Sequence, residues 1–206
     1  MDEQAGSVKA NTVYKNGIFY GWNGNEYEEI KTPILNTGVA NTGCVAQEYG
    51  DSYSHQTILT ISQLAALTSA DNASLADGYL LYTFPAGEII INSASMQIAL
   101  TNAEHALETP VVGLGTTLGS TAVADLTNPA TLQNIITGTA VAGMAEEVLV
   151  KTAIPTAAVP FVIADGDAHT LYLNMAAAWG NTAGTALDVD LSGSVIINWS
   201  YLNNPA

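Results

Sequence analysis

The side chains of this sequence best suited to acid–base chemistry are its three histidines, His55, His105 and His169. Serine and aspartate residues lie near them in the sequence, so a Ser-His-Asp hydrolase is a first hypothesis. The G-x-S-x-G motif, which exposes a nucleophilic serine in many hydrolases, does not occur. A histidine that begins a strand more commonly hydrogen-bonds a turn. We therefore predict that the protein is not an enzyme and has no catalytic residues.

Oxygen ligands alternate along Asp165-Gly166-Asp167-Ala168-His169, and Asp188 and Asp190 fall on one face of a predicted strand. Ca²⁺ binds about six to eight oxygen atoms in proteins, so a calcium site is chemically feasible. The EF-hand pattern does not occur, and Asp-Gly-Asp is far more commonly a tight turn. We therefore predict a turn here and no metal site.

Two further patterns in the sequence bear on cofactor chemistry. The glycines from Gly113 to Gly119 follow a G-x-G-x-x-x-G spacing with no lysine nearby and no clear helix after them, which does not fit a phosphate-binding loop. Cys44 is the only cysteine, so no intrachain disulfide forms, and no histidine or basic neighbour in the sequence activates it. We predict an inert thiol and no cofactor.

Composition restricts the partners. The chain has 206 residues, 19 acids, four lysines and no arginine, for a formal net charge of −15. Long-range repulsion disfavours nucleic acid and anionic lipid. Only 11% of residues are charged while 48% are hydrophobic, a balance typical of β-proteins on large assemblies. Neither a membrane span nor a signal peptide is evident, so we expect synthesis in a cytoplasm.

The most apolar segment is Tyr79–Leu100, YLLYTFPAGEIIINSASMQIAL. Pro85-Ala86-Gly87 between its two arms suits a turn, which predicts a β-hairpin in the core. In the second arm the apolar positions change from odd (Ile89, Ile91) to even (Met96, Ile98, Leu100) across Ser93-Ala94-Ser95. Because side chains alternate along a strand, this change predicts a β-bulge or corner.

Other strands follow from alternation. The segment from Leu187 to Tyr201 carries its apolar residues on odd positions, with a kink or a hairpin turn at Ser192-Gly193. Two short helices are predicted, one at Gln63–Leu67 and one after Asn128, where Pro129 and Gly138 fit the start and end of a helix. Further strands are predicted at residues 55–62, 147–153 and 169–175.

The N-terminal segment Thr12–Ile30 contains two Asn-Gly pairs, Asn16-Gly17 and Asn23-Gly24. Asn-Gly between aromatic and β-branched residues is a strong hairpin signal, so we predict a three-stranded meander. So small a sheet must dock on something. Its aromatic residues either pack on the rest of the chain or bind a partner. These candidate partner-binding residues are Tyr14, Phe19, Tyr20, Trp22 and Tyr27.

These elements predict an all-β protein with a small N-terminal β-meander arm. Its body is expected to be a jelly-roll β-sandwich or, as the alternative, another Greek-key β-sandwich. No helix is long enough for a parallel crossover, so the sheets should be antiparallel. We expect an arm and meander at residues 1–31, a linker at 32–50 and the sandwich body at 51–206.

Four phrases of the body resemble small head-decoration (cement) proteins of tailed bacteriophages. They are HQTILT from His55, LLYTFPAGEIIINSASMQIALT from Leu80, VVGLGTT from Val111 and VIINWSYL from Val195. The N-terminal VYKNGIFYGWNGNEYEEI is similar to short meanders of phage structural proteins. The resemblance implies a jelly-roll or related β-protein on the outside of a capsid shell, often a trimer, which clamps neighbouring capsomers. It carries over no functional residue.

The expected function is therefore capsid decoration, with the major capsid protein and a homotrimer of the chain itself as partners. The expected location is the outer capsid surface of a virion, after synthesis in the host cytoplasm. The alternative is a carbohydrate- or receptor-binding β-sandwich module, as in a phage head fibre or an adhesin. In that alternative Trp22, Trp179 and Trp199 would provide stacking faces.

Overall fold

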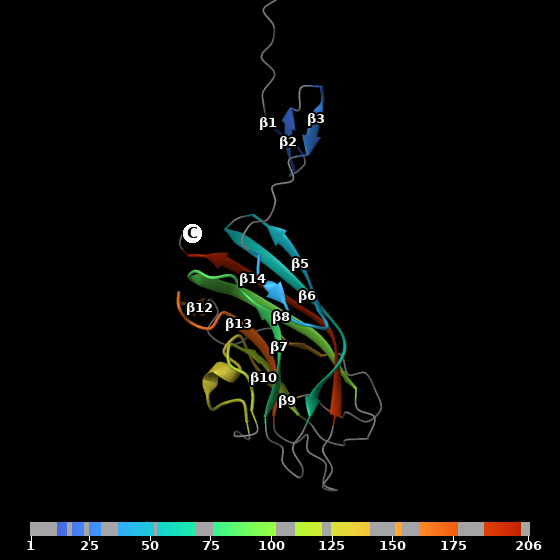
Figure 1. Ribbon diagram of the computed structural model, residues 1–206, viewed down its shortest axis with the longest axis vertical. Helices are drawn as coiled ribbons and strands as arrows, with labels where there is room; N and C mark the ends of the chain where they lie inside the picture. Colours follow the sequence, from blue (N-terminus) through green and yellow to red (C-terminus); the bar gives the residue numbers. More distant parts are fainter. Residues whose placement is uncertain are drawn as a thin grey trace, which may run out of the picture. The chain divides into compact units, whose positions relative to one another are not determined.

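A computed structural model of the chain divides into two compact units, Met1–Pro33 and Ile34–Ala206 (Figure 1). The structure describes residues 12–15, 18–22, 25–29, 37–51, 53–68, 76–101, 110–120, 125–140, 151–153, 161–176 and 188–202.

The first unit is a three-stranded antiparallel sheet. Its strands, in the order β1-β2-β3, are β1 (Thr12–Lys15), β2 (Ile18–Trp22) and β3 (Tyr27–Glu29). The predicted three-stranded meander is thus confirmed. Its two Asn-Gly pairs lie outside the described residues.

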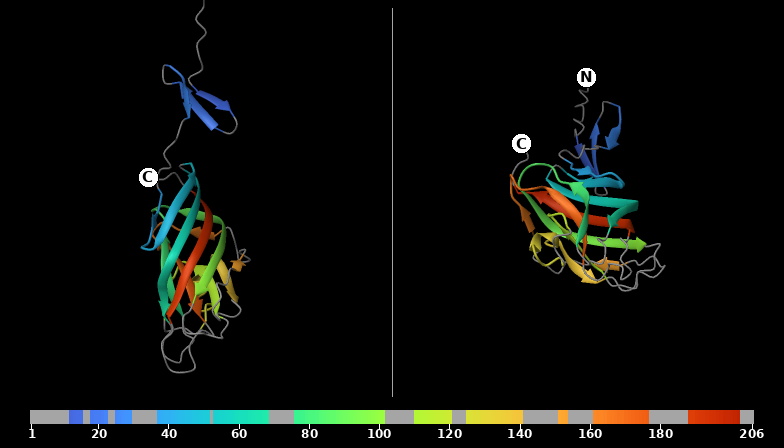
Figure 2. Two further views of the ribbon diagram at one scale, coloured as in Figure 1. Left: turned by 90° about the vertical axis from the view of Figure 1, so that its right-hand side faces the viewer. Right: turned by 60° about the horizontal axis from the view of Figure 1, so that its bottom comes forward.

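The second unit is a sandwich of two antiparallel sheets (Figures 1 and 2). In the described residues one sheet has the strand order β10-β9-β13-β7-β4, and the other has the order β11-β8-β14-β6-β5, with β12 also paired to β8. The predicted all-β sandwich is confirmed. The strands are β4 (Val39–Ala40), β5 (Cys44–Gly50), β6 (Ser54–Thr68), β7 (Asp77–Thr83), β8 (Ile89–Thr101), β9 (Val111–Gly115), β10 (Ile136–Ala140), β11 (Lys151–Ala153), β12 (Phe161–Ile163), β13 (Thr170–Ala176) and β14 (Asp188–Tyr201).

The strand order is that of a jelly roll. From β6 to β9 the chain changes sheet at every step, and the late strands β13 and β14 insert between β7 and β9 and between β6 and β8. The four-stranded sets β6-β14-β8-β11 and β7-β13-β9-β10 make up the roll. Strands β4 and β5 extend one sheet each at its edge.

Strand β14 shows how alternation builds the core. Its odd residues Val189, Leu191, Val195, Ile197 and Trp199 are fully buried, as the sequence predicted. The strand is continuous, so Gly193 marks a kink rather than a hairpin turn. Gly193 has a φ of +132°, and a Cβ there would lie 2.2 Å from the backbone oxygen of Gln97, so both conformation and space require glycine.

Strand β8 contains the predicted bulge. Asn198 of β14 pairs with Ser93 while the next residue, Trp199, pairs with Ile91, so Asn92 is the extra residue. The inward-facing positions therefore change from Ile91 to Ala94, and both are buried.

The predicted hairpin across Tyr79–Leu100 is wrong. Its first arm, β7, pairs with β13 and β4, and its second arm, β8, lies in the other sheet. Residues 85–87 carry the chain from one sheet to the other. Both arms are apolar because the two sheets face each other and bury their inner sides in one core. In the sequence, two apolar strands from facing sheets have the same residue pattern as two strands paired in one sheet.

Both predicted helices are also wrong. After Pro129 only Ala130–Leu132 forms a single 3-10 turn, and Gly138 lies inside β10. The β-branched run from Ile135 to Thr137 favours the strand. At residues 63–67, β6 continues to Thr68 and pairs with β14.

The predicted linker at residues 32–50 needs correction too, because Ile34 already belongs to the second unit and this segment contributes the edge strands β4 and β5. The glycines that resembled linker punctuation, Gly38, Gly43 and Gly50, flank these short strands. The strand predicted at 169–175 is confirmed as β13. Of the one predicted at 147–153, β11 is the part within the described residues.

Asn174 is buried at the middle of β13. Its Nδ2 donates to the carbonyl oxygens of Thr117 (2.9 Å) and Leu132 (2.8 Å), and its Oδ1 accepts from the backbone N–H of Gly119 (2.7 Å). One amide thus attaches the segment after β9 and the 3-10 turn to the five-stranded sheet.

Candidate functional site

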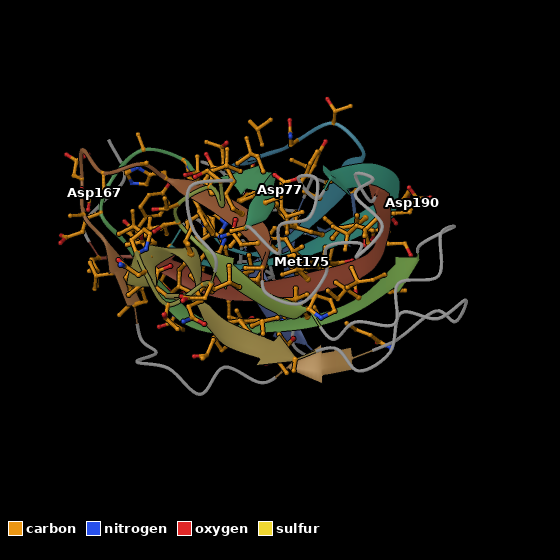
Figure 3. The ribbon with its side chains drawn as sticks, turned by 90° about the horizontal axis from the view of Figure 1, so that it is seen from below. Asp77, Asp167, Met175 and Asp190 are labelled. Atoms are coloured by element: carbon orange, nitrogen blue, oxygen red, sulfur yellow. The ribbon has the colours of Figure 1, made fainter. Side chains whose placement is uncertain are left out.

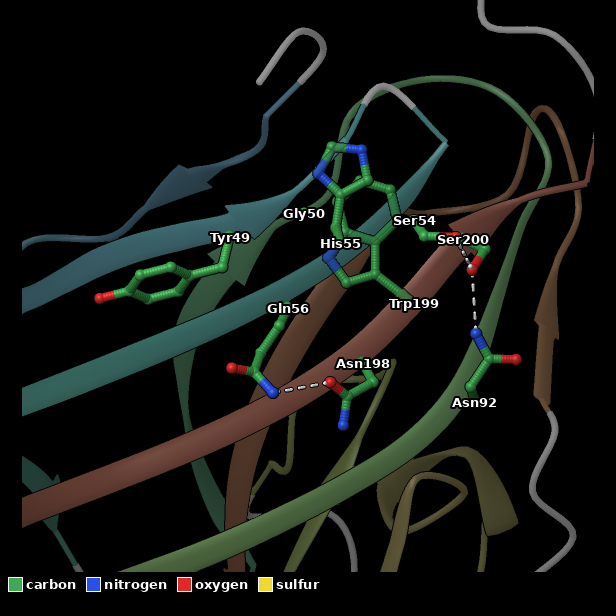
Figure 4. A pocket seen from close by; sticks show the side chains of 9 residues that line it. All are labelled: Tyr49, Gly50, Ser54, His55, Gln56, Asn92, Asn198, Trp199 and Ser200. Carbon is green, nitrogen blue, oxygen red and sulfur yellow. Dashed lines mark hydrogen bonds between the residues drawn. The ribbon is translucent and has the colours of Figure 1, made fainter. Parts of the chain in front are cut away.

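A shallow hollow of about 420 Å³ lies on the six-stranded sheet, at the end where β5 turns into β6 (Figure 4). It joins four strands that are far apart in the sequence: β5, β6, β8 and β14. Apart from the buried His55, no lining side chain ionises near neutral pH. The lining residues are Tyr49, Gly50, Ser54, His55, Gln56, Asn92, Asn198, Trp199 and Ser200.

Polar side chains form a hydrogen-bonded row across the hollow. Gln56, Asn198 and Ser93 occupy paired positions on three neighbouring strands, so their side chains share one face. Gln56 Nε2 donates to Asn198 Oδ1 at 3.0 Å, and Asn198 Nδ2 donates to Ser93 Oγ at 2.7 Å.

A second row lies closer to the end of the sheet. Asn92 Nδ2 donates to Ser200 Oγ at 3.0 Å, and the hydroxyls of Ser200 and Ser54 lie 3.4 Å apart. Asn92 is the bulge residue of β8 and is exposed. The bulge therefore places an extra amide in the hollow.

Aromatic side chains lie under the polar rows. The His55 ring stacks on Trp199, with centroids 4.0 Å apart and planes 7° apart. Phe84 and Tyr201 meet Trp199 edge-on at centroid distances of 5.7 and 5.5 Å. Trp199 is fully buried, so the interpretation of Trp199 as a stacking face for a ligand is wrong. The Trp22 side chain and Trp179 lie outside the described residues.

The exposed aromatic ring of the hollow is Tyr49, which sequence reasoning missed. Tyr49 lies on edge strand β5 and is 50% exposed. In Figure 4 its ring projects beside Gln56, away from the His55–Trp199 stack. The alternation of β5, in which Cys44, Ala46 and Glu48 point inward, would have identified it had the segment been recognised as a strand.

A buried hydrogen-bond network supports the hollow from within. Trp199 Nε1 donates to Thr57 Oγ1 (2.8 Å), which donates to Glu48 Oε2 (2.8 Å). The Tyr82 hydroxyl donates to the other Glu48 oxygen and accepts the backbone N–H of Gly38 (2.7 Å). Burial, together with the hydrogen bond to Glu48 and its charge, raises the pKa of Tyr82, so the phenol remains a donor. The network connects β5, β6 and β14 with β7 of the opposite sheet.

The two described histidines, His55 and His169, lie in packing and turn contacts. His55 is buried beneath the hollow, and the carboxylate of nearby Asp51 accepts the backbone N–H groups of Tyr53 and Ser54 at 2.8 Å, which lowers its pKa. His169 lies with its ring nitrogens 2.7 Å from the carbonyl oxygens of Asp167 and Gly87, which confirms the predicted contact with a turn. His105 lies outside the described residues.

The aspartates considered for calcium do not come together. Asp167 N donates to Ala164 O at 3.1 Å and Gly166 has a φ of +92°, so this segment is the predicted tight turn. Figure 3 places Asp167 and Asp190 at opposite ends of the sandwich. Among the described residues no three His, Cys, Asp or Glu side chains gather as a metal site.

The other two patterns have packing explanations. A Cβ on Gly115 would lie 2.2 Å from the backbone oxygen of Thr131, so this glycine lets the 3-10 turn approach β9. Cys44 is buried, and burial raises the pKa of its thiol to about 11.

The predicted partner-binding residues lie in the first unit. Strand pairing places Tyr14 opposite Phe19 and Trp22 opposite Tyr27. Tyr27 is 37% exposed, and the side chains of the other four, Tyr20 included, lie outside the described atoms.

Two edge strands of the body, one from each sheet, and the turn after them carry exposed apolar side chains that sequence reasoning did not identify. Val39, Val45, Tyr49 and Tyr53 are each at least half exposed and lie along β4, β5 and the turn after β5. We call these four residues the edge strip. Its only ionisable neighbours in the sequence between Val39 and Tyr53, apart from Cys44, are Glu48 and Asp51, and Glu48 points inward.

A scan against protein-family models finds no match to this chain, and no curated protein matches it. In the part of the chain that the structure describes, no helix has the length and apolarity to cross a membrane.

Proposed function

We propose that this protein is a structural component of a virion, a capsid decoration (cement) protein that binds the outside of a phage head and stabilises capsomer contacts. The observation that carries the proposal is the division of the chain into a small aromatic-rich sheet and a separate jelly-roll body. A three-stranded sheet of this size buries too little apolar area to be stable alone, so a surface on a partner suits it.

The body supports the same proposal. The edge strip is apolar and almost uncharged. Charged side chains commonly protect an edge strand from pairing with another chain, so an edge strand that lacks them offers its backbone N–H and C=O groups to a partner. Jelly rolls recur in viral capsid proteins, which is an argument by analogy. In this proposal the first unit binds the major capsid protein and the body forms a homotrimer, without a cofactor, a metal or catalysis.

The proposal is tested with full-length protein and undecorated tailed-phage head shells in a co-sedimentation assay. Trp22→Ala combined with Tyr27→Ala should remove binding, because these residues face each other across two strands of the first unit. The matched control is Val162→Ala, an exposed apolar residue of the body outside the edge strip. Unchanged binding by the double variant would contradict the assignment of the first unit as the anchor.

Light scattering tests the trimer. The full chain should have about three times the 21.4 kDa mass of one chain. A variant lacking residues 1–31 should still have about three times the mass of its own shortened chain and should lose shell binding, provided that circular dichroism shows a folded body. A monomer in both forms would contradict trimerisation in solution.

A second candidate function is a carbohydrate- or receptor-binding module. The hollow favours it, since its lining combines neutral amides and hydroxyls with one exposed aromatic ring.

A further inference from the structure

We infer that the hollow binds an uncharged glycan of hexopyranose units. One ring stacks on Tyr49, and the hydroxyls of that unit and of the next one along the glycan hydrogen-bond the amides of Gln56, Asn198 and Asn92 across the strands β6, β14 and β8. The inference deepens the second candidate function and does not depend on capsid binding.

The side-chain amides of Gln56, Asn92 and Asn198 can make more hydrogen bonds than they make in the two polar rows. Each has two N–H donors and an oxygen with two lone pairs. Within the described part of the chain, the two polar rows use one of these positions on Gln56, one on Asn92 and two on Asn198. Gln56 and Asn92 are exposed. A polyol, which presents adjacent donors and acceptors, complements this set.

Tyr49 supplies the apolar part of the site. A pyranose ring has one face of C–H groups and a rim of hydroxyls, so it needs an aromatic surface beside polar groups. The half-exposed Tyr49 lies on β5, next to Gln56 on β6 (Figure 4). The hollow, at about 420 Å³, falls within the size range of small-molecule sites.

Charge selects among sugars. No lysine is among the described residues that line the hollow, and the chain carries a net charge of −15. Uronic and sialic acids would be repelled, since nothing in the lining neutralises a carboxylate. The site therefore fits uncharged glycans.

The hollow is supported by packed groups. Asn198 is held between Gln56 and Ser93, and the His55–Trp199 stack beneath it is joined to Thr57 and Glu48. Side chains already fixed in the free protein lose little entropy on binding. A shallow site of this kind can therefore still discriminate between sugars.

The experiment is affinity electrophoresis of the full chain in native gels that contain dextran, mannan or galactan, with polygalacturonate as the anionic comparison. At least one neutral polysaccharide should retard the protein, and polygalacturonate should not. Tyr49→Ala and Asn198→Ala should each weaken the apparent affinity about tenfold, which corresponds to about 1.4 kcal/mol.

The matched control is Tyr53→Ala, because Tyr53 is as exposed as Tyr49 and lies outside the lining of the hollow. It should keep wild-type retardation, and all variants should keep the wild-type circular dichroism. Failure of all three neutral polysaccharides to retard the protein would overturn the inference, as would an equal loss in Tyr53→Ala and Tyr49→Ala. The same variants are also tested for co-sedimentation with head shells. A loss of sugar binding without a loss of shell binding separates this inference from the capsid proposal.

Discussion

Two buried polar clusters join strands of the sandwich, and they do so by different chemistry. Asn174 satisfies its amide with three backbone groups from the segment after β9 and from the 3-10 turn. Glu48, Tyr82, Thr57 and Trp199 instead satisfy one another, side chain to side chain, across both sheets. The first cluster is neutral, while the second contains a carboxylate and a phenol.

The difference shows what each part of the fold needs. The segments around β9 have irregular backbone, whose N–H and C=O groups need partners when buried, and a single amide supplies both kinds. The edge strand β5 already pairs with β6, so its remaining need is attachment to the opposite sheet. We expect the Asn174 cluster to tolerate no replacement and the Glu48 cluster to tolerate an isosteric one.

The largest effect should come from breaking the backbone-satisfying cluster. Asn174→Ala removes the hydrogen-bond partner of the buried Gly119 N–H and Leu132 carbonyl and of the half-buried Thr117 carbonyl, and it should lower the free energy of unfolding by about 3 to 5 kcal/mol. Asn174→Asp should also destabilise the fold strongly, because a carboxylate cannot donate to the two carbonyls. Urea denaturation measures both. Asn92→Ala, an exposed amide, is the control and should stay within about 0.5 kcal/mol of wild type.

A smaller effect is expected at the side-chain cluster. Glu48→Ala removes the acceptor of Tyr82 and Thr57 and should cost about 2 to 3 kcal/mol, whereas Glu48→Gln keeps one oxygen and should cost about 1 kcal/mol. Gln47→Ala is the neighbouring control, because Gln47 is exposed on the other side of β5. Equal losses in Glu48→Ala and Glu48→Gln would show that the pairing of acceptor and donor does not matter here.

The smallest effect is expected in the pH dependence of stability, to which the Glu48 cluster contributes and the Asn174 cluster does not. The pKa of Tyr82 is raised in the folded protein, so above about pH 10 the unfolded chain loses the phenol proton first and stability falls. Cys44, Tyr79 and Tyr201 also have raised pKa values and add to this fall. Tyr82→Phe should therefore reduce the decline between pH 9 and 11, by up to about 1.4 kcal/mol per pH unit. Asn174→Asp should leave the decline unchanged; thermal denaturation at each pH tests both.

The alternation of apolar and polar residues predicted those features of the fold that depend on a single strand. It gave the inward residues of β14, and it predicted a bulge in β8 from the change in register between Ile91 and Met96. The extra residue is Asn92, one position before the segment Ser93-Ala94-Ser95 at which the bulge was expected. Alternation could not say which sheet a strand joins, so β7 and β8 were interpreted as a hairpin. The short edge strands β4 and β5 were hidden because glycines flank them.

The hollow was beyond sequence reasoning for the same reason. Its residues meet because β14 lies between β6 and β8, and this strand order is set by packing of the whole body. One error was avoidable: Trp199 shares the odd register of Val195 and Ile197, which already indicated burial rather than an exposed stacking face. Tyr49 needed β5 to be identified first.

The strands β13 and β14 lie between strands that precede them in the sequence, and this order affects how the protein folds during its synthesis. On the ribosome β6 emerges long before its second partner, β14, since β6 ends at Thr68 and β14 begins at Asp188. Until then β6 and β8 lack the strand that joins them, and β7 and β9 wait for β13 in the same way. The body can complete its sheets only after Tyr201 has been synthesised, so a nascent chain must keep these apolar strands from pairing with its neighbours on the same message.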